Sequence, residues 1–272
     1  MSLFRAVVLG ITQGLTEYLP VSSSGHLVLV RWLFGWNDFA ETEALSKTFD
    51  VALHLGTLGG AATYFRHDIV RLVRAALARS KSADGRLAWL IALATVPAAV
   101  FGAVFTRTFE ESSNQIWLIA VMLIVGAAAL AWADGTLGKR TVHEVSIRDA
   151  LIIGVSQAAA LQPGLSRSAI TISVGRFVGL GRDGAARFAF LMSIPIVAGA
   201  LIFKAIDAQG EGGIPADFVA PFFWGVVASA VTGYIAVWGT LKLVRSRSFL
   251  SFVLYRVFLA VFVLALLATP FR

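Results

Sequence analysis

Six apolar segments, each long enough to cross a lipid bilayer as one helix, constrain what this chain can fold into. They cover residues 46–65, 86–106, 115–134, 184–206, 217–241 and 249–269, and a membrane-spanning helix needs about 20 mainly apolar residues. Hydrophobic residues make up 57% of the 272 residues and charged ones 14%, against about 25% charged in an average soluble domain. The pattern predicts an all-α, polytopic membrane protein and excludes a disordered chain, a coiled coil and an ordinary soluble domain.

Two further apolar segments, 3–36 and 148–181, are interrupted in the middle. The interrupting sequences are YLPVSSSG at 18–25 and QPGLSRS at 162–168. Proline and glycine stop a helix, and serine is a good N-cap for the next one. Each half is too short to cross a bilayer, and non-helical backbone at this depth must be buried in protein or line a wet cavity. We therefore predict two re-entrant helix–loop–helix hairpins.

The two interrupted segments resemble each other, which indicates an internal repeat. Gly10, Gln13, Pro20 and Ser23 recur at a nearly constant spacing as Gly154, Gln157, Pro163 and Ser166, and Phe49 and Gly60 recur as Phe188 and Gly199. We predict one membrane domain, 1–272, built from repeats at about 1–134 and 148–269. Each repeat would hold one hairpin and three spans. Because three is odd, the second repeat would be inverted relative to the first, a plan known from transporters.

Lysine and arginine set the expected orientation. The chain carries a net charge of +7, and basic residues gather in the connections 66–86, 135–148 and 242–247. The positive-inside rule places these connections in the cytoplasm and both termini outside. Residues 67–81 form a basic amphipathic pattern, expected on the inner membrane surface. This explanation of the charge argues against a nucleic-acid partner. The absence of cysteine excludes a disulfide framework, a thiol nucleophile and a Cys zinc site.

Polar and ionisable residues inside membrane segments are costly and are candidates for function. In the first hairpin they are Gln13, Glu17, Ser22, Ser23, Ser24 and His26, and in the second Ser166, Arg167, Ser168 and Thr171. Gln13 and Glu17 share a helix face, as do Arg167 and Thr171, because each pair is four residues apart. If the two loops meet, they gather a carboxylate, an amide, hydroxyls, an imidazole and a guanidinium in one cavity.

This set of groups suits a phosphate. Arginine grips phosphate oxygens in a planar fork, and the starts of broken helices attract anions. Ser23 beside His26 can be an activated nucleophile. Glu17 would bind a divalent cation or accept a proton.

Structural explanations compete with this reading. The serine turn could serve only as a helix cap and hinge. His26 could be only a hydrogen-bonded residue at the end of a helix. Glu17 and Arg167 could form only a structural ion pair. Asp50 and His54, one turn apart in the first span, are either an accessory site or a helix-packing pair.

Three stretches carry a resemblance to a known family. Residues 13–27 (QGLTEYLPVSSSGHL) and 163–171 (PGLSRSAIT) resemble the two signatures of the undecaprenyl-diphosphate phosphatases, the integral-membrane bacitracin-resistance enzymes. Residues 49–56 (FDVALHLG) resemble the segment after the family's first loop. The similarity runs from about residue 6 to the last span.

The resemblance implies hydrolysis of undecaprenyl diphosphate to undecaprenyl phosphate and inorganic phosphate. This step recycles the lipid carrier for peptidoglycan and cell-envelope synthesis and confers bacitracin resistance. It also implies a divalent cation, Mg²⁺ or Ca²⁺, and an active site reached from the outer face of the bacterial inner membrane.

By motif position, the resemblance assigns catalysis to Glu17, Ser23, His26 and Arg167, with Glu17 a candidate metal ligand. Substrate binding would fall to Gln13, Ser22, Ser24, Ser166, Ser168 and Thr171. Gln13 stands where other members have Glu, so one carboxylate is missing from the pair. Serine, histidine and water remain open as nucleophile. The oligomeric state also stays open between monomer and homodimer.

A transporter or lipid flippase is the rival reading, because inverted repeats with broken helices are typical of secondary transporters and a fold does not fix function.

Overall fold

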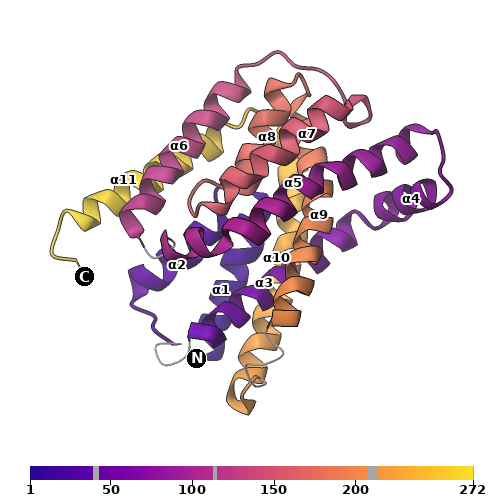
Figure 1. Ribbon diagram of the computed structural model, residues 1–272. Helices are drawn as coiled ribbons and strands as arrows, with labels where there is room; N and C mark the ends of the chain where they lie inside the picture. Colours follow the sequence, from indigo (N-terminus) through magenta and orange to yellow (C-terminus); the bar gives the residue numbers. More distant parts are fainter. Residues whose placement is uncertain (39–42, 113–114, 208–213, 272) are drawn as a thin grey trace.

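The computed structural model describes residues 1–271 except 39–42, 113–114 and 208–213, and the described chain is built from helices (Figure 1). The long helices are α1 Leu3–Tyr18, α2 Ser23–Phe34, α3 Glu43–Tyr64, α4 Arg66–Leu77, α5 Ala83–Ser112, α6 Ile116–Asp134, α7 Ile147–Ser156, α8 Arg167–Phe177, α9 Arg182–Asp207, α10 Ala216–Val244 and α11 Leu250–Leu267. Two short 3₁₀ helices, η1 Val142–Glu144 and η2 Gln157–Leu161, complete the described elements.

Five of these helices are long and apolar enough to cross a membrane. They are α5, α6, α9, α10 and α11, and they coincide with five of the six predicted spans. The remaining predicted span, 46–65, is helical in α3 but is not among the five, because Lys47, Asp50 and His54 lower its hydropathy. The prediction of an all-α, multi-pass membrane protein is confirmed for the described residues. The number of six spans stays a prediction.

Both interrupted segments fold back on themselves. In the first, Arg5 near the start forms a 2.7 Å ion pair with Asp38 after the end. In the second, Arg140 before α7 accepts a 2.8 Å hydrogen bond from the backbone N–H of Gly181 after α8. Figure 1 shows the α1–α2 hairpin in the lower half of the molecule and the α7–α8 hairpin in the upper half. Each broken helix is therefore a helical hairpin, and its placement in a membrane stays a prediction.

The second helix of each hairpin begins in the same way. Ser22 (φ 80°) caps α2, and its Oγ accepts a hydrogen bond from Gly25 N–H. Ser166 (φ 75°) caps α8, and its Oγ accepts from Ala169 N–H. The structure thus pairs Ser22 with Ser166, one residue away from the sequence-based pairing of Ser23 with Ser166. The domain boundaries and the inversion of the repeats stay predictions.

Close glycine contacts hold α1 and α3 against α10. A Cβ added at Gly10 would lie 2.3 Å from the carbonyl oxygen of Gly225, and one at Gly56 would lie 2.4 Å from that of Val226. Small residues let membrane helices approach this closely, and van der Waals packing then stabilises them. This packing fixes α1, and with it the first half of the first hairpin.

A buried arginine joins the two hairpin loops. Arg256 of α11 is 0% exposed. Its guanidinium donates to the carbonyl oxygens of Pro20, Gly164 and Leu165 in the two loops, at 3.0–3.1 Å. It also donates to the carbonyls of Met122 and Leu123 in α6. Because the helix breaks free the three loop carbonyls from helical hydrogen bonds, Arg256 supplies the donors that apolar surroundings lack.

We expect Arg256→Leu to destabilise the protein severely, because several buried carbonyls would lose their donors at about 1–3 kcal/mol each. Thermal unfolding in detergent should show a Tm lower by about 6 °C or more, at 2–4 °C per kcal/mol for a chain of this size. Arg247→Leu, at an exposed position just before α11, is the matched control and should leave Tm nearly unchanged. Equal Tm values for the two variants would contradict the role assigned to Arg256.

Candidate active site

The two hairpin loops meet inside the protein, which fulfils the condition set by the sequence analysis. The backbone N–H of Gly164 donates to Ser22 Oγ at 3.2 Å. Ser168 Oγ donates to the carbonyl of Leu19 at 3.0 Å. Together with the bonds from Arg256, these contacts bring residues more than 140 positions apart into one small region.

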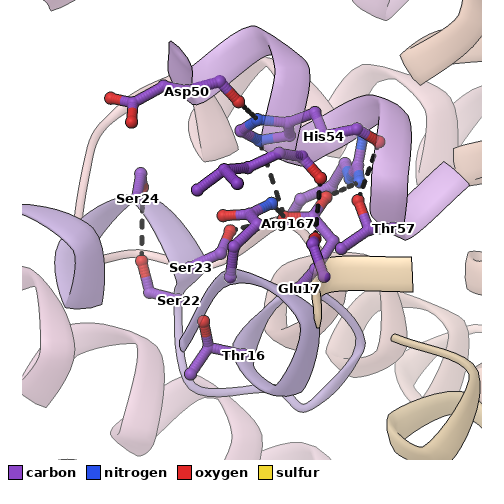
Figure 2. A network of polar contacts seen from close by, with 12 residues as sticks. Thr16, Glu17, Ser22, Ser23, Ser24, Asp50, His54, Thr57 and Arg167 are labelled. Atoms are coloured by element: carbon purple, nitrogen blue, oxygen red, sulfur yellow. Dashed lines mark hydrogen bonds and ion pairs between the residues drawn. The ribbon is translucent and has the colours of Figure 1, made fainter. Parts of the chain in front are cut away.

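Glu17 is the centre of a polar cluster in this region. Its carboxylate accepts hydrogen bonds from Ser23 Oγ at 2.5 Å and Gln13 Nε2 at 3.0 Å, and it forms an ion pair with Arg167. The residue is only 8% exposed. Figure 2 shows Ser23 and Arg167 directed toward Glu17 from the two hairpins. An acid, an amide, a hydroxyl and a guanidinium, four of the groups expected together, therefore meet in these four residues.

Two helix N-termini converge on this cluster. Ser23 is the first residue of α2 and Arg167 the first of α8. The backbone N–H groups of Ser23, Ser24, Arg167 and Ser168 have no acceptor among the described residues. Such N–H groups and the positive end of the helix dipole attract anions. The cluster thus combines a cationic side chain with two anion-binding helix starts.

The remaining hydroxyls of the predicted site do not contact Glu17, and three of them stabilise the loops. Ser22 and Ser166 are N-caps, and Ser168 binds the Leu19 carbonyl. Thr171 donates to the carbonyl of Arg167 within α8, at 2.8 Å. Ser24 is exposed, and its Oγ lies 3.5 Å from Ser22 Oγ. Among the serines, only Ser23 contacts Glu17 through its side chain in the described structure.

His26 lies away from Ser23, and both of its ring nitrogens are engaged. Nδ1 lies 2.7 Å from the carbonyl oxygen of Ser22, and Nε2 lies 2.7 Å from Tyr255 Oη. A carbonyl only accepts, so Nδ1 carries the hydrogen and Nε2 accepts from the Tyr255 hydroxyl. The His26 and Tyr255 rings are also stacked, with centroids 5.6 Å apart. The expected contact of His26 with the Ser23 hydroxyl is replaced by one between Ser23 and Glu17.

Asp50 and His54 separate into two roles. The Asp50 carboxylate binds the guanidinium of Arg31 through both oxygens, at 2.5 and 3.0 Å, and points away from the cluster in Figure 2. His54 Nδ1 donates to the Asp50 carbonyl, and its Nε2 lies 3.7 Å from the Glu17 carboxylate. His54, one third exposed at its side chain, is thus the histidine that lies at the cluster.

Sequence reasoning missed three residues that support this arrangement: Arg31, Tyr255 and Arg256. Arg31 and Arg256 stand inside apolar segments, so the rule that flagged Glu17 and Arg167 also applies to them. Tyr255 carries no such signal, because tyrosine is common in membrane helices near the interface.

The oxygen atoms near Glu17 are of the kind that Mg²⁺ or Ca²⁺ prefers. Gln13 Oε1 is buried and has no hydrogen-bond partner, and it belongs to the same side chain that binds Glu17. No group of three or more His, Cys, Asp or Glu that could hold a metal occurs in the described ranges. These residues fit a cation that takes its other ligands from a bound phosphate, the usual arrangement for Mg²⁺.

Comparison with known proteins identifies the family. The sequence model of the family described as bacitracin resistance protein BacA matches residues 6–262. The chain belongs to this family. The BacA family match contains both hairpins, the Glu17 cluster and Arg256.

Curated relatives named undecaprenyl-diphosphatase cover nearly the whole chain. The one from Pelotomaculum thermopropionicum is 46% identical over 268 residues, covering 97% of each chain. The one from Geobacter sulfurreducens is 46% identical over 273 residues, covering 98% of this chain and 99% of its own. The one from Moorella thermoacetica is 42% identical over 267 residues, covering 97% and 98%. The BacA family resemblance predicted from the motifs is confirmed.

Proposed function

We propose that the protein is a membrane phosphatase that hydrolyses undecaprenyl diphosphate to undecaprenyl phosphate and inorganic phosphate. The observation that carries the proposal is the meeting of two helix N-termini, Arg167 and a serine bound to a carboxylate. Phosphoryl transfer depends mainly on positioning and charge neutralisation, and these groups supply both. The names of the relatives support the same activity.

Arg167 and the N–H groups of the two helix starts would bind the terminal phosphate. In the described structure Arg167 is paired with Glu17. A phosphate with more than one negative charge competes for the guanidinium, because arginine binds phosphate through two parallel hydrogen bonds. As Arg167 turns to the phosphate, Glu17 retains its contact with Ser23. Substrate binding would thereby exchange the Arg167–Glu17 ion pair for one between Arg167 and the phosphate, while Glu17 keeps its hydrogen bonds from Ser23 and Gln13.

Ser23 is the nucleophile in this mechanism. Its Oγ attacks the terminal phosphorus, its proton passes to Glu17, and the bond from phosphorus to the bridging oxygen breaks. Undecaprenyl phosphate leaves, and a phosphoserine remains on the enzyme. Water then hydrolyses the phosphoserine and releases inorganic phosphate. His54 lies beside Glu17 with Nε2 directed to the cluster, so it is the second group that can take a proton from that water.

A divalent cation, Mg²⁺ or Ca²⁺, would be held by Gln13 Oε1 and Glu17 together with the phosphates. When bound, it would neutralise charge on the diphosphate. His26 would act as a positioning residue: its Nδ1–H holds the carbonyl of Ser22, directly before the nucleophile.

The proposed orientation follows the positive-inside rule. The basic connections face the cytoplasm, and both termini lie on the outer face of the bacterial inner membrane. The α1–α2 hairpin then enters the membrane from outside and the α7–α8 hairpin from the cytoplasm. α3 supplies the sixth span, and the two repeats are inverted. The expected absence of a nucleic-acid partner and the choice between monomer and homodimer stay predictions.

Purified protein in detergent micelles should release inorganic phosphate from undecaprenyl diphosphate. We expect a chelator to abolish the release and Mg²⁺ or Ca²⁺ to restore it. Micelles have no second compartment, so transport cannot produce this signal. A folded protein that binds the lipid and releases no phosphate would instead support the transporter or flippase reading.

Single replacements of the three adjacent serines distinguish the proposed nucleophile from the residue that caps α2. We expect Ser23→Ala to lower kcat by a factor of about 10³ or more, since the covalent route disappears. Ser24→Ala is the matched control and should retain activity within about tenfold, because its hydroxyl is exposed and contacts only Ser22. Ser22→Ala should mainly lower stability, by about 1 kcal/mol for a lost N-cap.

The attacking group can also be trapped directly. Quenching wild-type turnover of labelled substrate should yield an adduct that is stable in acid and labile in alkali, as phosphoserine is. An acid-labile adduct mapped to His26 would overturn the assignment of Ser23. Near-normal turnover in Ser23→Ala without any adduct would indicate attack by water.

Two variants of His26 distinguish positioning from proton transfer. Asparagine places an amide N–H close to the position of Nδ1 but cannot act as a base at neutral pH. We expect His26→Asn to retain activity within about tenfold with an unchanged pH profile, while His26→Leu, which leaves the Ser22 carbonyl without its donor, loses far more. If folded His26→Asn is as inactive as His26→Leu, His26 takes part in the chemistry itself.

A further inference from the structure

A pocket lies away from the Glu17 cluster. It has a volume of about 880 Å³ and is bounded by the end of α6, the η1 loop, the α8–α9 turn and the end of α10. None of the residues of the Glu17 cluster lines it. We call it the basic pocket, because six cationic side chains line it: Lys139, Arg140, Arg176, Arg182, Arg187 and Arg245.

The acidic residues of the basic pocket do not balance these cations. Asp134 and Asp183 are its only lining carboxylates among the described residues. Asp134 is occupied by Arg182 Nε at 2.5 Å and by the Phe249 N–H. Asp183 is shared by Arg187 and Arg245, at 3.3 and 2.9 Å. Two carboxylates outside the lining also pair with pocket cations: Asp149 lies 2.6 Å from Arg140 and Asp68 lies 3.8 Å from Arg187. The surplus of positive charge therefore rests on Lys139 and Arg176, which have no ion pair among the described residues.

Arg176 is the buried member of this set of cations. It is only 4% exposed, and its guanidinium donates to the carbonyls of Thr136, Gly138 and Leu180. Its Nε is buried without a hydrogen-bond partner, and no carboxylate in the described chain pairs with it. A buried charge without a counter-charge is costly, so a bound anion would stabilise this arrangement. Lys139, exposed and without an ion pair among the described residues, lines the same pocket.

An apolar rim indicates what kind of anion fits: it consists of Leu137 in the pocket and of Trp132 and Phe177, which lie near pocket residues in the chain. Leu137 lines the pocket and is 90% exposed. Trp132, 77% exposed in the last turn of α6, contacts Phe177 edge to face, with ring centroids 5.2 Å apart. Exposed aromatic rings at helix ends are typical of the membrane–water interface. An amphiphile with a phosphate head and acyl chains would satisfy both the cations and this rim.

We propose that the basic pocket binds the phosphate of an anionic phospholipid, with the acyl chains against Trp132, Leu137 and Phe177. Basic pockets between membrane helices on the cytoplasmic side suit such headgroups. The site is separate from the proposed active site and does not depend on the proposed activity. Scattered basic residues are expected on this face in any case. The buried Arg176, which has no ion pair among the described residues, distinguishes the pocket from them.

Native mass spectrometry of the purified full chain in detergent tests the proposal. Phosphatidylglycerol should bind more tightly than phosphatidylcholine. The double variant Lys139→Gln/Arg245→Gln, at two exposed pocket positions, should weaken phosphatidylglycerol binding about tenfold or more. Arg176→Gln is the obvious variant, but it removes donors from three backbone carbonyls and threatens folding. The matched control is Arg74→Gln/Arg79→Gln, which removes two exposed charges near α4 and should leave binding unchanged.

Three results would overturn the proposal. Unchanged phosphatidylglycerol affinity in the folded pocket variant would show that the pocket does not bind it. Equal losses in the pocket variant and the control would indicate diffuse surface charge. Displacement of phosphatidylglycerol by millimolar inorganic phosphate would show that the pocket takes free phosphate rather than a lipid headgroup.

Discussion

The arrangement of this protein depends on how the carbonyl groups of two broken helices are satisfied inside an apolar interior. Breaking a helix in a buried apolar region frees carbonyls from their hydrogen bonds, and apolar side chains offer no donors in exchange. Arg256 supplies them from a third helix and binds Pro20, Gly164, Leu165 and α6 with one guanidinium. Gly126 makes room for it, since a Cβ there would lie 2.0 Å from Arg256 Nη2. The two loops can meet because this side chain holds them together.

The same two breaks create the site. Each break ends one helix and starts another, and the first residues of the two new helices, Ser23 and Arg167, direct their side chains to one carboxylate. The two hairpins are alike in their serine caps and differ in the residue that follows. In one hairpin that residue is a hydroxyl, and in the other a guanidinium. The same backbone arrangement thus presents two different chemical groups to Glu17. The proposed mechanism uses one as the nucleophile and the other to bind the phosphate.

Three arginine side chains of this chain lie in three different environments. Arg167 is paired with a carboxylate that a phosphate can replace, whereas Arg256 is held by carbonyls on all sides. Arg176 is intermediate, because three carbonyls hold its terminal nitrogens while its Nε has no partner. These environments explain why we assign Arg167 to the reaction, Arg256 to the fold and Arg176 to a further anion site.

The sequence by itself determined the class of fold and most members of the site. Runs of apolar residues are read locally, since a bilayer requires about 20 of them per helix, and Pro20, Pro163 and Gly164 mark the breaks without any tertiary information. Costly polar residues in these segments pointed to Gln13, Glu17, Ser23 and Arg167, which the structure brings together.

Only the tertiary structure decided which side chain contacts which. Spacing along the chain placed His26 one turn from Ser23, but Tyr255, 229 residues away, occupies its Nε2, and the carbonyl of Ser22 occupies Nδ1. The tertiary structure also pairs the Asp50 carboxylate with Arg31 and places His54 beside Glu17. A hydrogen bond needs two atoms within about 3 Å and aligned, and the packing of distant helices sets that geometry. Residue spacing alone therefore defines the groups available to a site, while the packing of α1, α3, α8 and α11 selects the pairs they form.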